Sequence, residues 1–225
     1  RSLPARLITG LHDAGAAAIG LDIPLDFPSP PNLGGAVSDA LLMEAVTSAG
    51  TVSYPALPTA PVDQERLGFA VSAQGLTPGR SALQPLLDFD RIARRARLFH
   101  GNGSDELPAL GFSLATTFWQ VPLRQVERRS GQIRVQNARW PAGTTGSLTI
   151  PLDRQGRLLL NFAGRQVPTA FPGTTVLELS RILDRKDNEA LGTLVNGKVV
   201  FLFTQSHTQP ERTLPSGDDA SDMLL

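Results

Sequence analysis

Two early segments of the chain carry apolar residues at helical spacing, and each is followed by a glycine and a short apolar run. The first, residues 3–14, is predicted to be a helix whose inward face is formed by Leu3, Leu7, Ile8 and Leu11. Gly15 suits a left-handed end to this helix, and the run AAAIGLDI is predicted to follow as a strand.

The second segment repeats this order of helix, glycine and strand. The stretch DALLMEAVTSA is predicted to be a helix whose inward face is formed by Leu41, Leu42, Ala45 and Val46. Gly50 ends it, and TVSYPAL is predicted to be the next strand. Because parallel neighbouring strands need a packed crossover between them, this repetition predicts parallel βα units in the N-terminal part.

The middle of the chain changes to shorter segments. DFDRIARRARLF is typical of a strand with one polar face, and residues 108–119 are predicted to form a helix. QIRVQN, SLTIPL and RLLLNF are separated by turn residues, which predicts antiparallel strands. TTVLELSRILD predicts an amphipathic helix capped by Thr174 or Thr175, and KVVFLF predicts a buried strand.

These elements together predict an α/β fold. We expect a mixed sheet with parallel βα units in the N-terminal part, antiparallel strands in the middle and helices packed on the sheet. No low-complexity linker divides the 225 residues, so we predict a single domain over residues 1–225. The ends, RSLPARLI and SDMLL, are typical of the inside of amphipathic elements, so we expect a domain truncated at both ends within a longer protein.

Charge and composition exclude several classes of function. Lys plus Arg and Asp plus Glu each number 21, so the chain lacks the basic excess that nucleic-acid binding requires. It has no cysteine, which excludes disulfides, thiolate metal sites and a cysteine nucleophile. No apolar run approaches the ~20 residues needed to span a bilayer, and the N-terminus lacks the layout of a signal peptide.

Short motifs that look catalytic lack the required context. GTLVNGKV resembles a phosphate-binding loop up to Val199, where Ser or Thr is needed, and it precedes a strand instead of a helix. We interpret it as a helix-to-strand turn with Gly197 at positive φ. GFSLA lacks the second glycine of a nucleophile elbow, which places Ser113 on a helix.

The histidines do not suggest a metal site. The chain has His12, His100 and His207, and their spacing puts none of them beside a partner on one helical face. We expect each at a surface or loop position. The sequence therefore predicts no catalytic residue, no metal site and no cofactor.

A proline-rich stretch, PLDFPSPPNLGG, separates the first predicted strand from the second predicted helix. Its prolines and glycines exclude regular structure, so we expect an exposed loop at the carboxyl end of that strand, where open α/β sheets hold ligands. Asp22 and Asp26 beside this loop are candidate ligand-binding residues, since paired carboxylates serve acid–base or metal chemistry. The alternative, which we favour, is that they cap loop amides.

Three further side chains are candidates for the same pocket. Arg94 and Arg95 are adjacent in a predicted strand, so they point to opposite faces and one needs an anionic or carbonyl partner. The pair is an ion-binding candidate or a structural strut, and we favour the strut. Asn161 follows RLLL before a glycine; it contacts ligand, or, as we favour, is a buried amide that satisfies loop backbone.

Several blocks, in order, resemble one family, the second type of CHASE domain. RSLPARLITGLHDAGAAAIGLDIPLDFP is similar to its segment of helix, Ala-Gly turn and strand ending in Asp before a Pro-containing loop. LGFA and DFDRIARRARLF are similar to its Gly-Phe segment and double-arginine strand, and LPALGFSLA to its Pro-Ser-Leu-Ala helix start. IPLDRQGRLLLNFAG and LVNGKVVFLF resemble the last third of the family.

Two departures from the family pattern bear on ligand binding. Arg91 stands where the family has the Gly of the turn before the double arginine, and TQSHTQPERTLPSG keeps little of the small-residue loop that follows the last strand. The family's first strand, upstream of RSLPARL, is absent from the chain. If the loop over residues 204–217 contacts ligand in relatives, the specificity differs here or binding is lost.

The resemblance implies an extracytoplasmic sensor of a bacterial transmembrane receptor, tethered by segments outside this chain and passing a conformational signal to a cytoplasmic cyclase or kinase. It implies an unknown small-molecule ligand, and a homodimer stays open. We expect the terminal segments, residues 1–14 and 214–225, to connect to the membrane. The alternatives are a structural or dimerisation module without a ligand and, last, a hydrolase.

Overall fold

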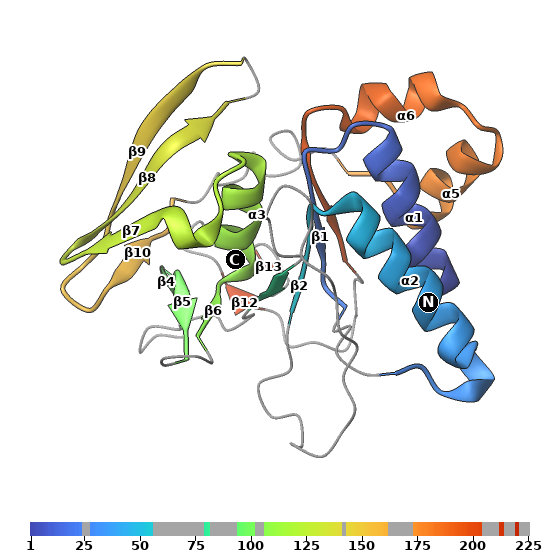
Figure 1. The fold of residues 1–225 in the computed structure, drawn as a ribbon, viewed down its shortest axis with the longest axis horizontal. Helices are drawn as coiled ribbons and strands as arrows, with labels where there is room; N and C mark the ends of the chain where they lie inside the picture. The colour runs from blue at the N-terminus through green and yellow to red at the C-terminus, as the bar shows by residue number, and fades with distance from the viewer. Residues whose placement is uncertain are drawn as a thin grey trace.

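The computed structural model describes residues 1–23, 28–55, 79–81, 94–101, 106–140, 143–161, 173–203, 212–213 and 219–220. In this part of the chain, two groups of elements lie on either side of helix α3 (Leu110–Phe118) (Figure 1). One group contains a parallel sheet with its helices, and the other consists of antiparallel strands. The predicted mixed α/β fold is confirmed.

The parallel sheet has the strand order β11-β1-β2-β3. Its strands are β1 (Ala18–Leu21), β2 (Val52–Pro55), β3 (Gly79–Ser81) and β11 (Val199–Leu202). Strand β1 pairs in parallel with both β2 and β11, so the last strand of the sheet returns beside the first. The predicted parallel βα units of the N-terminal part are therefore present.

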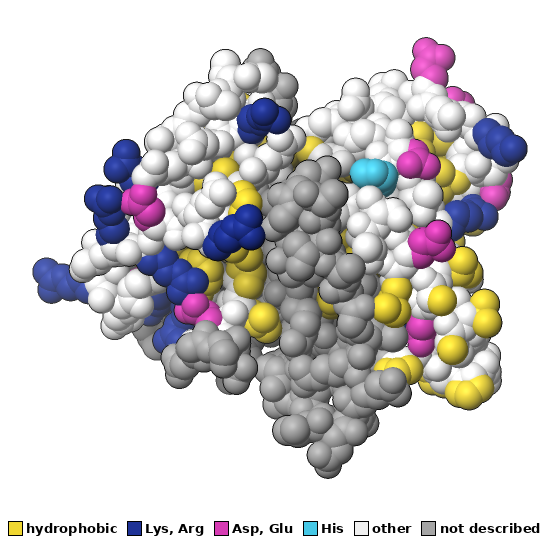
Figure 2. Space-filling view, in the orientation of Figure 1, with side chains coloured by type: hydrophobic (Ala, Val, Ile, Leu, Met, Phe, Trp, Pro, Cys, Tyr) yellow, Lys and Arg dark blue, Asp and Glu magenta, His cyan; other side chains and the backbone are white. Residues whose placement is uncertain are grey.

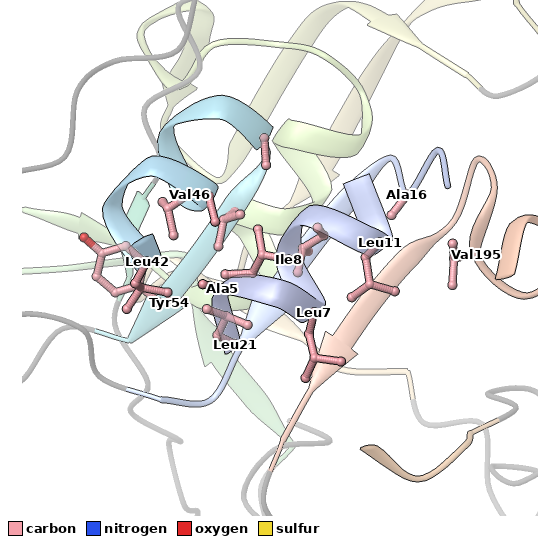
Figure 3. Close-up of a cluster of buried hydrophobic side chains, with 14 of the residues drawn as sticks. Ala5, Leu7, Ile8, Leu11, Ala16, Leu21, Leu42, Val46, Tyr54 and Val195 are labelled. Carbon is pink, nitrogen blue, oxygen red and sulfur yellow. The ribbon is translucent and has the colours of Figure 1, made fainter. Parts of the chain in front are cut away.

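Helices α1 (Ser2–Asp13) and α2 (Gly35–Ala49) cover one face of this sheet and form the largest hydrophobic cluster with it. Figure 3 shows side chains from both helices, among them Ile8 and Leu42, packed over Leu21 and Tyr54 of the strands. Gly15 (φ 87°) and Gly50 (φ 62°) lie in the left-handed region after the two helices, as predicted.

The C-terminal helices extend the same cluster. Helix α5 (Val176–Asp184) is capped by Thr175, whose side chain accepts a hydrogen bond from Glu178 N at 3.1 Å, and it contributes Leu179. Helix α6 (Asn188–Val195) contributes Leu191 and Val195. The turn into β11 has Gly197 at φ 68°, which is the helix-to-strand turn predicted for GTLVNGKV.

The antiparallel group packs around a second hydrophobic cluster. Strands β7 (Val126–Arg129), β8 (Gln132–Arg139) and β9 (Thr145–Pro151) form one sheet, and β10 (Arg157–Leu159) pairs with β4 (Arg95–Arg97). Short elements complete it: β5 (Phe99–His100), β6 (Leu107–Pro108) and the 3-10 turn η3 (Leu123–Gln125). Residues 212–213 and 219–220 pair as β12 (Arg212–Thr213) and β13 (Asp219–Ala220).

Helix α3 joins the two groups because its two sides enter different clusters. Leu110 and Leu114 pack with Ala18 and Phe201 of the parallel sheet. Phe112 instead enters the cluster of the antiparallel strands, where its ring lies edge-on against Phe99 at 5.3 Å between centroids. Within the described residues, no helix is both long enough and apolar enough to cross a bilayer.

Three local predictions differ from the structure, and a fourth lies partly outside the described residues. KVVFLF is not a buried strand, because β11 lies at an end of the described sheet and Val199 is 43% exposed. Leu3 and Leu41, predicted to face inward, are exposed. The proline-rich stretch contains the 3-10 turn η1 (Pro31–Leu33), and α2 begins at Gly35. Residues 88–93 of the predicted DFDRIARRARLF strand lie outside the described residues.

Candidate functional site

Three of the five predicted ligand-binding residues meet at the β4–β10 ladder. Arg95 pairs with Leu159, and Leu160 N donates a hydrogen bond to the Arg94 carbonyl at 2.9 Å. Asn161 is the next residue along the chain. The antiparallel pairing of two distant segments therefore brings Arg94, Arg95 and Asn161 to one place.

A turn that follows β9 orders this ladder. The Oδ1 atom of Asp153 accepts hydrogen bonds from Gln155 N at 2.8 Å and Arg157 N at 2.9 Å, and Gly156 (φ 72°) closes the turn. The Oδ2 atom accepts from Arg157 Nε at 2.8 Å and lies 3.6 Å from Arg95 Nε. The backbone hydrogen bond from Arg157, with the other donors, lowers the pKa of Asp153 below its usual value.

Arg95 thus forms the ion pair that the strut interpretation requires, and it lies on a positively charged face. Arg95 and Arg97 alternate onto the same side of β4, and Arg157 lies directly opposite Arg97. Of these three guanidinium groups, those of Arg95 and Arg157 pair with the carboxylate of Asp153. Such a face can accept an anionic group, because bidentate arginine contacts to carboxylate or phosphate are strong.

Asn161 does not fit the environment that we favoured for it. Its side chain is exposed, so the prediction of a buried amide is wrong. An exposed amide can hydrogen-bond to water and does not have to satisfy loop backbone. Its assignment as a ligand contact stays a prediction.

The two predicted aspartates lie elsewhere. Asp22 directly follows β1 at the carboxyl end of the parallel sheet, where its N–H donates to the Leu202 carbonyl at 2.9 Å. Asp26 lies outside the described residues. The ladder that holds Arg94, Arg95 and Asn161 belongs to a different sheet, so the described structure does not assemble all candidates into one site.

A buried carboxylate that sequence reasoning missed is Asp39 of α2. It accepts hydrogen bonds from Ser29 N and Ser29 Oγ, each at 2.7 Å, and pairs with Arg1 at 3.1 Å. Burial alone would raise its pKa, but the Ser29 hydrogen bonds and the Arg1 guanidinium outweigh burial and lower the pKa of Asp39. The signal was available, since Asp39 precedes the inward residues Leu42 and Val46 at helical spacing.

Small and hydroxyl-bearing side chains line the contact between α3 and the parallel sheet. Ser53 of β2 and Ser113 of α3 are both buried, and their hydroxyl oxygens lie 2.8 Å apart in a hydrogen bond. At Gly20 of β1, an added Cβ would meet the side chains of Phe201 and Leu114. Ser113 lies on a helix, as predicted, and its hydroxyl is bonded to another serine.

The described histidines differ in their surroundings. His12 is exposed on α1, while His100 is half-buried in β5 and its Nε2 lies 3.2 Å from the Arg97 carbonyl. Burial lowers the pKa of His100, and the charge of Arg97 acts in the same direction. His207 lies outside the described residues. Among residues that are described, no three His, Asp or Glu side chains gather as metal ligands do.

Comparison with known proteins gives one match. The family model described as the CHASE2 domain matches residues 1–222, which is nearly the whole chain. CHASE2 domains are a family of extracellular sensory domains and not catalytic ones. No curated protein and no solved structure matches the chain.

Proposed function

The chain belongs to the CHASE2 domain family, and we propose that it is the extracytoplasmic ligand-sensing domain of a bacterial transmembrane receptor. In this proposal the domain lies on the periplasmic side of the cell membrane and is tethered by segments outside this chain. It passes a conformational signal to a cytoplasmic cyclase or kinase. The match of the family over residues 1–222 is the observation that carries the proposal.

A sensor needs two arrangements with different affinities for its ligand. Helix α3 is suited to move between such arrangements, because it packs against both the parallel sheet and the antiparallel group. Its contact with the sheet combines the apolar packing of Leu110 and Leu114 with the Ser53–Ser113 hydrogen bond, in which either hydroxyl can be the donor. We place the movement at this contact.

The proposed ligand contacts are those predicted from the sequence, Asp22, Asp26, Arg94, Arg95 and Asn161. At the β4–β10 ladder, an anionic ligand group would compete with Asp153 for Arg95. Such an exchange alters the turn at Asp153 and the strand pairing behind it. The exchange would couple ligand binding to the antiparallel group, because the hydrophobic cluster of that group includes Phe112 of α3.

A disulfide between α3 and β2 tests the proposal. The chain has no cysteine, and the oxygens of Ser53 and Ser113 are 2.8 Å apart, so Ser53→Cys with Ser113→Cys places two thiols close to the bonding distance of about 2.05 Å. In the full-length protein, oxidation should change cyclic-nucleotide or phosphorylation output by at least about fivefold, and reduction should restore it.

The single variants Ser53→Cys and Ser113→Cys are the controls, since each carries a thiol but cannot form the bond. Their output should not respond to oxidation. If the disulfide forms quantitatively and output stays the same, α3 does not transmit the signal.

One observation favours the second candidate function, a structural or dimerisation module. Helix α2 exposes large apolar side chains, with Val37 75% exposed. In a module of this kind, the disulfide between α3 and β2, which we call the α3 lock, would leave the output unchanged. The same experiment therefore separates the two functions.

A further inference from the structure

An apolar stripe lies on the outer side of α2 and the turn before it. The residues of this stripe are all exposed, and we call them the α2 stripe: Leu33, Ala36, Val37, Ala40 and Leu41. Val37 is 75% exposed, Leu33 65% and Leu41 47%. Figure 2 shows apolar side chains gathered at the lower right, over the region where Figure 1 places the beginning of α2.

The stripe is unusual because the opposite side of α2 is apolar too. Leu42, Val46 and Ala49 face the main hydrophobic cluster. A surface helix ordinarily carries polar residues on its outer side, and a contiguous apolar surface on a folded domain marks an interaction site. The stripe is therefore a candidate interaction surface of this group of elements.

Charge decides against a membrane or an acidic protein as that partner. Helix α2 has no lysine or arginine, and its two acids are Asp39, which is buried and paired with Arg1, and the exposed Glu44. A helix that lies on a membrane surface carries basic residues that contact anionic lipid. The stripe offers no such contact and ends at a negative charge.

Shape favours a second copy of the same chain. Within α2, Val37 and Leu41 are four residues apart and form a ridge, Ala36 and Ala40 form a low row beside it, and Leu33 of η1 lies before the helix. When two such helices pack across a two-fold axis, the ridge of each lies over the alanine row of the other. We propose that the α2 stripe is the interface of a homodimer formed by α2 from two copies of this chain.

The size of the stripe sets the expected strength. Stable interfaces bury about 800 Å² on each partner, and five residues, two of them alanine, supply only part of that area. Association of free domains is therefore weak, whereas anchoring in a membrane raises the effective concentration of the two copies. The inference deepens the proposed sensing role, on which this anchoring rests, but its test uses neither ligand nor output.

Cysteine cross-linking in the full-length protein tests the interface. The natural chain has no cysteine, so cysteine is placed in turn at Ala36, Val37 and Ala40. Mild oxidation should give a disulfide-linked dimer for at least one of the three. Leu177→Cys on α5 is the matched control, because Leu177 is also a large exposed apolar residue, 62% exposed, and it should cross-link at least about tenfold less.

A charge placed in the stripe supplies the second measurement. Leu33→Glu should reduce the cross-link of the best position at least tenfold, because two carboxylates would be buried against apolar side chains, and Leu177→Glu should not. Equal cross-linking of all positions, or none at the stripe, overturns the proposal. Loss of maleimide labelling at Val37→Cys on vesicles of anionic lipid, without cross-linking, would instead assign the stripe to a membrane and overturn it too.

This result is independent of the α3 lock. If the α3 lock leaves the output unchanged but the stripe cross-links, the sensing mechanism is rejected and the proposed dimer is supported. If the α3 lock changes the output but the stripe does not cross-link, the sensing mechanism is supported and the proposed dimer is rejected.

Discussion

The carboxylate of Asp39 holds the beginning of α2 to the segment before it. The carboxylate itself is buried, and it accepts two hydrogen bonds from Ser29 and pairs with Arg1, so that losing these partners would be costly. Asp39 is thus a structural residue although it is charged. Its pKa is lowered in the folded state, which ties stability to pH.

We predict that Asp39→Asn lowers the free energy of unfolding by about 1–3 kcal/mol at pH 7, measured by urea unfolding. In the natural protein this contribution is fully present above the unfolded pKa of about 3.9 and is lost as the pH falls through the lower folded pKa. The difference between the two proteins should therefore shrink below about pH 4.

Asp184→Asn is the control for this measurement, since Asp184 pairs with Arg6 at 3.0 Å on the exposed surface. Such a pair contributes about 0–1 kcal/mol. Equal stabilities of the Asp39→Asn and natural proteins at pH 7 would show that the buried network does not stabilise the fold.

The candidate site could be predicted from the sequence only in part, and Arg95 and Asn161 show why. The adjacent arginines and the asparagine before a glycine were visible as unusual polar residues beside strands. Their neighbour Asp153 was not, because it reaches Arg95 only through the pairing of β4 with β10. The exposure of Asn161 likewise depends on packing that no local pattern contains.

A second prediction concerns the turn at Asp153. Asp153→Asn should speed amide hydrogen exchange at Gln155 and Arg157, because both amides donate to its Oδ1 and the charge also attracts Arg157 and Arg95. Arg154→Gln, a change in the same turn at an exposed side chain, should leave these rates alone. Unchanged exchange in Asp153→Asn would remove the ordering role that we assign to this carboxylate.

At the level of elements, local sequence patterns predict the type of each element better than they predict which other elements lie beside it. The helix of residues 108–119 and the βα units were correct, because periodicity and turn glycines act within a segment. The apolar run KVVFLF predicts a buried strand, but such a run does not reveal whether the strand has one neighbour or two. The prediction that Leu41 faces inward is wrong because α2 is apolar on both sides, so its periodicity does not identify the buried side.

The packing of α3 on β1 gives a third prediction. Gly20→Ala should destabilise the protein by about 1–3 kcal/mol, because the new methyl group meets the side chains of Phe201 and Leu114. Gly111→Ala, on the exposed side of the same helix, meets nothing within 4 Å and should be neutral or stabilising. Thermal unfolding of both variants measures the contrast, and equal melting temperatures would contradict close packing at Gly20.

For the whole molecule, the chain path makes the two groups of elements interdependent. The first hydrophobic cluster takes residues from α1 to β2 and again from α5 and α6, whereas the second is built from the segment between them. The antiparallel group is therefore an insertion into the parallel one. Helix α3 packs against both, so the prediction of a single domain depends on this helix.

Calorimetry of the chain tests that dependence. We expect one cooperative unfolding transition for the natural protein, because α3 packs on the parallel sheet through Leu110 and Leu114 and on the antiparallel group through Phe112. Leu114→Ala should cost about 2–5 kcal/mol and split the transition in two, since it removes packing between α3 and β1.

Leu42→Ala removes the same atoms inside the first cluster, so it should lower a single transition without splitting it. Two transitions in the natural protein would mean that the chain folds as two domains. A single transition in Leu114→Ala would mean that contacts other than this side of α3 hold the groups together, and the proposed movement at the α3 contact would then have to overcome them.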